Sequence, residues 1–250
     1  MSETARMWME VTFNVAYLIV VWGLVATMAL RREEVALQDR PVARRIRWAF
    51  ALLALGDTGH VGFRVLAYAL GDMEATINVL GIDAGLVGLG ALSTAVTVTF
   101  FYVLVLDAWR VHFQRGYGPF EYLLLASAAA RLVLMVPAAN EWNNVVPPQP
   151  WSLVRNLPLV VLGLGTAYLI LRDARRAGDR AFLWIGIMIL VSYAMYTPVI
   201  LFVQQAPLVG MLMIPKTVAY VVIGFLAYAS LYGRQSSRDD ARAAFEQFLG

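Results

Sequence analysis

Residues 11–32 read VTFNVAYLIVVWGLVATMALRR, in which an uncharged stretch from Val11 to Leu30 is followed directly by Arg31 and Arg32. A transmembrane helix needs about 20 consecutive, mainly apolar residues. Loops rich in arginine stay on the cytoplasmic side of a membrane. The stretch therefore predicts a membrane-spanning helix whose C-terminal end lies in the cytoplasm. A cleaved signal peptide has the opposite charge order, so we expect this span to be retained.

Further segments of the chain have the same length and character. The predicted spans are Val11–Leu30, Ala49–Leu70, Ala84–Leu106, Phe120–Ala138, Trp151–Leu171, Ala181–Val203 and Leu208–Tyr232. Of the 250 residues, 60% are hydrophobic and 15% are charged, whereas about a quarter of the residues of a soluble domain are charged. The sequence predicts an all-α, polytopic membrane protein built as one seven-transmembrane-helix bundle.

The connections between the spans alternate in charge. The loops after the first, third and fifth spans contain arginine, as does the C-terminal tail. The loops Gly71–Asp83, Ala139–Pro150 and Gln204–Pro207 contain neither lysine nor arginine. This pattern predicts a multi-pass protein of the cell membrane with its N-terminus outside and its C-terminus in the cytoplasm. Because the basic residues lie mostly in short loops, the net charge of +3 indicates no nucleic-acid partner.

Two regions are expected along the chain. Residues 1–233 form the seven-helix transmembrane domain, and residues 234–250 form a short cytoplasmic tail. In the tail, Ala241, Ala244, Phe245 and Phe248 fall on one helical face, which is typical of an amphipathic helix. We expect such a helix to lie on the inner membrane surface.

Composition excludes several kinds of chemistry. The chain has no cysteine and two histidines, so thiolate chemistry, disulfides and zinc sites built on several imidazoles are excluded. No metal site is predicted. The sequence contains no nucleophile elbow, Walker loop, zinc-protease motif or dinucleotide fingerprint. Enzyme class, cofactor and oligomeric state therefore stay open.

Ionisable residues inside the predicted spans point to a functional site, because such groups are costly in a bilayer. Asp57, His60 and Arg64 are spaced to share one face of the second span. Lys216 in the seventh span is the only lysine of the chain. A desolvated amine can lose its proton or form a Schiff base, which a guanidinium does not readily do. The alternative is that Lys216 pairs with Asp57 or another acid and locks the second and seventh spans together.

The middle of the predicted membrane layer is rich in cations. Arg64, Arg131, Arg155 and Lys216 lie in its middle or outer half. The acids of the same side lie in outer loops or at the outer edge, at Glu10, Asp72, Glu74, Asp83 and Glu141. Buried positive charge favours an anion such as a carboxylate or a phosphate. The alternative is that the edge acids reach inward and neutralise the layer. The candidate ligand-binding residues are Asp57, His60, Arg64, Thr94, Arg131, Tyr193, Tyr196 and Lys216.

Seven spans, an outside N-terminus and a lysine in the last span resemble the microbial rhodopsins. In that family the lysine carries retinal as a protonated Schiff base, and the aromatic group Tyr193, Tyr196 and Pro198 is loosely similar to the family's ring-packing helix. The chain departs from the family at Leu212, where an acid is expected. The third span also lacks the family's arginine and mid-depth acid, so Asp57 would have to serve as counterion.

Three further classes of function stay open beside that resemblance. The first is a sensor, receptor or transporter that binds a small anionic or lipidic ligand among the buried cations. The second is a membrane enzyme acting on a lipid or isoprenoid, with Asp57 and His60 as acid and base. The third is a structural or assembly role. The first class fits the buried arginines and needs no catalytic motif.

Overall fold

The computed structural model describes residues 3–79 and 81–233. The expected amphipathic tail helix lies outside these residues. Seven α-helices make up most of the described chain, namely α1 (Glu3–Leu30), α2 (Arg40–Leu70), α3 (Leu86–His112), α4 (Pro119–Leu134), α5 (Trp151–Ala177), α6 (Arg180–Phe202) and α7 (Met213–Tyr232). The all-α prediction is confirmed at this level.

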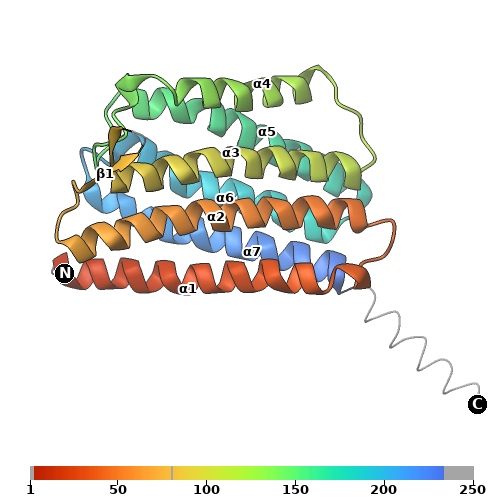
Figure 1. Cartoon of the computed structure of the whole chain (residues 1–250). Helices are drawn as coiled ribbons and strands as arrows, with labels where there is room; N and C mark the ends of the chain where they lie inside the picture. The colour runs from red at the N-terminus through yellow and green to blue at the C-terminus, as the bar shows by residue number, and fades with distance from the viewer. Residues whose placement is uncertain (1–2, 80, 234–250) are drawn as a thin grey trace, which may run out of the picture.

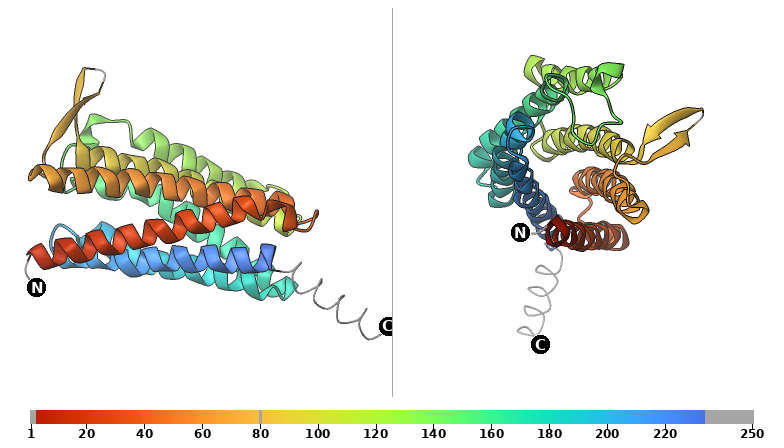
Figure 2. Two further views of the ribbon diagram at one scale, coloured as in Figure 1. Left: turned by 60° about the horizontal axis from the view of Figure 1, so that its bottom comes forward. Right: turned by 90° about the vertical axis from the view of Figure 1, so that its left-hand side faces the viewer.

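The helices run side by side as a single ring (Figures 1 and 2). Each helix packs against the next one along the chain, α7 returns to α1, and α3 also contacts α5 across the ring. The loops after α1, α3 and α5 lie at one end, which we call the arginine-rich end. The N-terminus of α1 lies at the opposite end (Figure 1).

Five helical segments are long and apolar enough to cross a membrane, namely α1, α3, α5, α6 and α7 with the turn before it. These helices indicate a multi-pass membrane protein. Two of the seven predicted spans do not meet the same criteria. Helix α2 is 31 residues long but carries Asp57, His60 and Arg64, and α4 has only 16 residues. At about 1.5 Å per residue, a helix of that length is shorter than the hydrocarbon core.

Two helices begin at residues that differ from the starts of the predicted spans. Helix α2 begins at Arg40 rather than Ala49, so four arginines of the predicted loop, Arg40, Arg44, Arg45 and Arg47, belong to its first turns. Helix α7 begins at Met213 rather than Leu208, after a 3-10 helix at Pro207–Leu212. Pro215 therefore lies in the first turn of α7, where a backbone donor has no partner within the α-helix in any case.

A β-hairpin within the loop after α2 is the main departure from a purely helical chain. Strands β1 (Thr76–Val79) and β2 (Ile82–Gly85) pair antiparallel, with Thr76 opposite Gly85. Gly81, with a φ of 86°, donates its backbone N–H to the side chain of Asn78 at 3.0 Å. The hairpin projects away from the ring (Figure 2).

Close packing of α2 on α3 fixes the depth of the polar residues on both helices. A Cβ at Gly90 would lie 2.9 Å from the Cα of His60, so only glycine allows this approach. Near the start of α3, a Cβ at Gly88 would lie 1.6 Å from the backbone oxygen of Trp142. These contacts bring Asp57 and His60 against α3 and hold the loop after α4 over the end of the ring.

The ring is filled by aromatic side chains toward the arginine-rich end. Phe50, Phe101, Tyr102 and Trp109 are at most 1% exposed. Phe101 makes edge-to-face contacts with Phe50 at 5.5 Å and with Tyr220 at 5.4 Å between ring centroids. This packed half forms the floor beneath a cavity in the other half.

Candidate functional site

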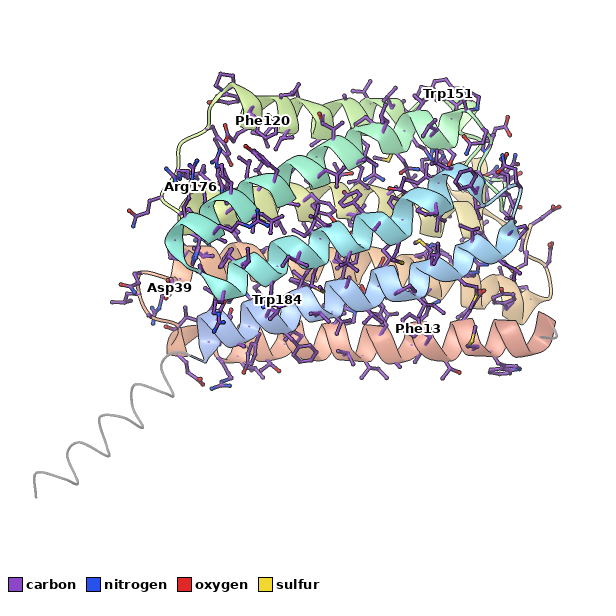
Figure 3. All side chains as sticks on the ribbon, turned by 180° about the vertical axis from the view of Figure 1, so that it is seen from behind. Phe13, Asp39, Phe120, Trp151, Arg176 and Trp184 are labelled. Atoms are coloured by element: carbon purple, nitrogen blue, oxygen red, sulfur yellow. The ribbon has the colours of Figure 1, made fainter. Side chains whose placement is uncertain are left out.

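A cavity of about 530 Å³ occupies the half of the ring near the N-terminus of α1. All seven helices contribute to its lining, for example through Tyr17, Asp57, Thr94, Arg131, Arg155, Tyr196 and Lys216. Phe13, which also lines it, lies in the half of the bundle that contains Trp151, whereas Asp39 and Arg176 lie at the arginine-rich end (Figure 3). The cavity thus gathers residues that are far apart in the sequence.

The cavity brings together most of the predicted site residues, which are Asp57, His60, Arg64, Thr94, Arg131, Tyr196 and Lys216. Tyr193 is not part of its lining. The Tyr193 side chain is 3% exposed, and its hydroxyl donates to the carbonyl of Leu159 at 2.8 Å. A Cβ at Gly163 would lie 2.0 Å from that hydroxyl. The tyrosine therefore fills the α5–α6 contact instead of facing the cavity.

The Asp57 carboxylate ties three helices together. Its Oδ2 accepts a hydrogen bond from the Tyr17 hydroxyl at 2.6 Å, and its Oδ1 accepts one from Thr94 Oγ1 at 2.5 Å. These donors come from α1 and α3. The described chain contains no hydrogen bond between Asp57 and His60, so the two side chains do not form an acid–base pair in this geometry.

Arg131 is the most deeply buried cation of the site, at 2% exposed. Its Nη1 donates to Thr99 Oγ1 at 2.8 Å and its Nη2 to Asn156 Oδ1 at 3.2 Å. The Tyr196 hydroxyl donates to the same Asn156 oxygen at 3.0 Å. The Nε of Arg131 is buried without a hydrogen-bond partner. Within the described residues, a buried guanidinium is thus held by neutral groups alone.

Lys216 places its amine between aromatic faces. Its Nζ lies 4.5 Å from the ring centroid of Tyr196 and 5.5 Å from that of Tyr220. Lys216 forms neither a hydrogen bond nor an ion pair in the part of the chain that the structure describes. Asp57 and Lys216 interact electrostatically, but in the described chain they form no ion pair, so the alternative of a direct lock between the second and seventh spans is not what the structure shows.

Arg155 is one of the cations predicted inside the membrane, but it is not among the candidate ligand-binding residues predicted from the sequence. Its guanidinium carbon lies 4.1 Å from the ring centroid of Trp142, and its Nη1 lies 3.3 Å from both oxygens of Asn140. Three other residues, Tyr17, Trp142 and Tyr220, line the cavity although the sequence did not predict them in the site. None of the three carries a charge. In an apolar sequence an uncharged aromatic residue gives no signal that separates a cavity wall from a core position.

The charges of the cavity do not balance. Four cations line it, Arg64, Arg131, Arg155 and Lys216, against two carboxylates, Glu10 and Asp57, which leaves +2 with histidine counted as neutral. Of the predicted edge acids only Glu10 lines the cavity, and it lies 3.9 Å from Arg64. The described residues therefore do not support the alternative in which acids at the outer edge of the membrane neutralise all the cations of the site.

The arginine-rich end contrasts with the cavity, because Asp107 and Asp173 there are each paired with two arginines. Asp107 is bonded to Arg45 and, at 2.7 Å, to Arg110. Asp173 contacts Arg172 at 2.9 Å and Arg115 at 3.1 Å. The Tyr117 hydroxyl donates to Asp107 at 2.9 Å, and burial together with this bond raises the pKa of the phenol. Here the charges hold helices and loops together.

In the described residues no three histidine, aspartate or glutamate side chains are grouped so that they could hold a metal ion. No protein-family model, no curated protein and no solved structure gives a match to the chain.

Proposed function

We propose that residues 1–233 form one domain that crosses the cell membrane seven times, with the N-terminus outside. The charged residues of α2 that lower its hydropathy line the cavity rather than face lipid, which is where intramembrane charges are tolerated. Helix α4 contributes Arg131 to the same cavity, so both helices belong to the ring. The loops between helices are basic at one end only, which supports a cytoplasmic location for that end.

This topology can be tested by cysteine labelling, because the chain contains no cysteine of its own. Glu74 is exposed beside the hairpin, and Arg176 is exposed at the arginine-rich end. We expect Glu74→Cys to react with a membrane-impermeant maleimide in intact cells, and Arg176→Cys to react only after permeabilisation. Labelling of Arg176→Cys in intact cells, with Glu74→Cys protected, would reverse the orientation.

We further propose that the cavity binds a small anionic or lipidic ligand, as part of a sensor or a transporter. The observation that supports this most is Arg131, a buried guanidinium without a carboxylate partner among the described residues, in a cavity with an excess of two positive charges. Burying an unpaired charge costs several kcal/mol in proteins, so an incoming anion would relieve a real cost. Guanidinium groups bind carboxylate and phosphate with forked hydrogen bonds.

The remainder of the lining indicates an amphiphilic ligand. Apolar side chains such as Leu53, Val61, Leu159 and Ile200 form the walls beside the cations. The volume of about 530 Å³ is within the range of small-molecule sites. A ligand with an acidic head and an apolar tail would satisfy both parts of this lining.

Binding of two probes of opposite charge tests this proposal. We expect the full-length protein in phosphatidylcholine nanodiscs to bind dodecanoate at least tenfold more tightly than dodecyltrimethylammonium in a calorimetric titration. Arg155→Gln should weaken dodecanoate binding about tenfold, which is the effect expected from the loss of roughly one hydrogen bond to a charged group. Arg176→Gln, an equal change of charge far from the cavity, should leave it unchanged. Equal affinity for both probes would refute an anion-selective cavity.

A Schiff-base protein of the retinal type is a second candidate, favoured by one observation. The Lys216 amine has no hydrogen-bond or ion-pair partner in the described chain and faces a cavity with aromatic walls. A neutral amine could attack an aldehyde, with loss of water, to give an imine. Asp57 interacts electrostatically with Lys216 and would act as the counterion of the protonated imine.

A further inference from the structure

A second cavity, of about 240 Å³, lies at the arginine-rich end. It is formed by a short 3-10 helix at Arg32–Glu34, the first turns of α2 and the last turn of α7. Its charged lining residues are Arg32, Arg40, Arg44, Arg47 and Glu33, which gives four positive charges against one negative, or +3. The cavity lies at the other end of the ring from the site described above.

Two of these arginines are engaged in building the wall. Arg32 contacts the Glu33 carboxylate at 3.2 Å, and Arg40 contacts it at 3.1 Å. Arg40 also donates to the carbonyls of Val35 at 3.1 Å and Glu33 at 3.0 Å. These bonds hold the turn after α1 against the start of α2.

The other two arginines are not engaged in this way. Arg44 and Arg47 lie three residues apart, on one face of α2, and line the cavity. Neither of them has an ion pair with a carboxylate in the described chain. Arg45, between them in sequence, turns to the bundle and bonds Asp107. Both side chains therefore line the same space, and no described carboxylate engages their donors.

A third group in the cavity also lacks a partner. Tyr232 is 1% exposed and lines the cavity. Its hydroxyl interacts electrostatically with Arg47 but has no partner at hydrogen-bond geometry within residues 3–79 and 81–233. The ring is fixed by stacking on Tyr228, with centroids 5.2 Å apart, and the Tyr228 hydroxyl accepts from Arg31. A buried hydroxyl left unpaired costs free energy, which an acceptor in the cavity would recover.

We propose that this cavity binds a phosphate group through Arg44, Arg47 and Tyr232. A phosphate monoester offers several acceptor oxygens and up to two negative charges, which matches two guanidinium forks and one hydroxyl. Among the described lining residues the one carboxylate, that of Glu33, is already bonded to Arg32 and Arg40, so it does not fill this role. The phosphate can come from the head group of an anionic lipid or from a soluble phosphate compound.

Binding assays on the full-length protein in nanodiscs test the proposal and separate the two sources. In phosphatidylcholine nanodiscs inorganic phosphate is the probe, and in a second set the discs contain phosphatidic acid, whose bound copies are counted by native mass spectrometry. Saturable binding of inorganic phosphate supports a soluble ligand, and retention of phosphatidic acid alone supports a lipid. Absence of both would overturn the proposal.

Variants locate the binding. The double substitution Arg44→Gln, Arg47→Gln should weaken binding of the retained probe at least tenfold. Arg175→Gln, Arg176→Gln is the matched control, because both residues are exposed at the same end and lie outside the cavity. An equal loss in the control would show that diffuse surface charge, not the cavity, attracts the phosphate.

The substitution Tyr232→Phe is an independent test, because it removes a hydroxyl without altering the charge of the cavity. We expect it to weaken phosphate binding about threefold and to leave the thermal unfolding temperature unchanged or slightly higher, because no described residue hydrogen-bonds the hydroxyl. Unaltered phosphate binding in Tyr232→Phe would remove the tyrosine from the site. A role in folding alone would lower the unfolding temperature and leave binding intact.

Discussion

Replacing Arg131 with methionine is expected to raise the thermal stability of the ligand-free protein and, at the same time, to weaken anion binding strongly. The side chain is 2% exposed, its hydrogen-bond partners in the described chain are neutral, and its Nε has none. Replacing buried charges with apolar side chains of similar volume is often stabilising by about 1–4 kcal/mol. The same change removes the deepest cation of the cavity, so affinity for dodecanoate should fall about a hundredfold.

Two control variants separate charge from volume. Arg131→Ala removes the same charge but leaves a void, which destabilises a packed interior, so its unfolding temperature should lie below that of Arg131→Met. Thr99→Val removes the acceptor of Arg131 Nη1 and should lower stability by about 1–3 kcal/mol. If Arg131→Met unfolds at a lower temperature than the wild type, the guanidinium is a structural group and the proposed cost of burying it is wrong.

Asp57→Asn is expected to have the opposite effects, which are a lower thermal stability and a tighter binding of anions. Asp57 accepts hydrogen bonds from Tyr17 and Thr94, and an amide oxygen accepts more weakly than a carboxylate, so stability should fall by about 2 kcal/mol. Loss of one carboxylate changes the charge of the cavity from +2 to +3. Dodecanoate should therefore bind about threefold more tightly, as measured by the same calorimetric titration.

This variant also separates a binding protein from an enzyme. If Asp57 serves as a catalytic acid or base on a lipid or isoprenoid, Asp57→Asn would retain substrate binding and lose turnover. Tighter anion binding with lower stability supports the binding protein. Weaker dodecanoate binding in Asp57→Asn would contradict the charge argument on which the cavity assignment depends.

The sequence was most informative where charges interrupt apolar runs. Arg131 and Lys216 are conspicuous because a bilayer tolerates such groups only at protected positions, and both line the cavity. The same reasoning placed Asp57, His60 and Arg64 on one face of α2. The number of spans and their orientation, by contrast, stay a prediction, because α2 and α4 do not have the hydropathy or length that identifies a span by itself.

The positions of several uncharged residues depend on tertiary contacts that cannot be predicted from a single sequence. Tyr193 and Tyr196 are three residues apart and share a helical face, yet Gly163 makes room for the Tyr193 hydroxyl between α5 and α6. Tyr17 joins the site because its hydroxyl reaches Asp57 from another helix. The hairpin of β1 and β2 was not predicted, because its residues lie in and beside a short connection between two apolar spans.

Native mass spectrometry of the detergent-purified protein, with and without borohydride, tests the central claim most directly. We predict a dissociable anionic mass on the wild-type chain that is absent from Arg131→Gln, with no adduct fixed by borohydride. An adduct fixed at Lys216 would contradict the anion-binding account and establish the Schiff base instead. A ligand mass equally present on the wild type and Arg131→Gln would show that the buried arginine does not hold it.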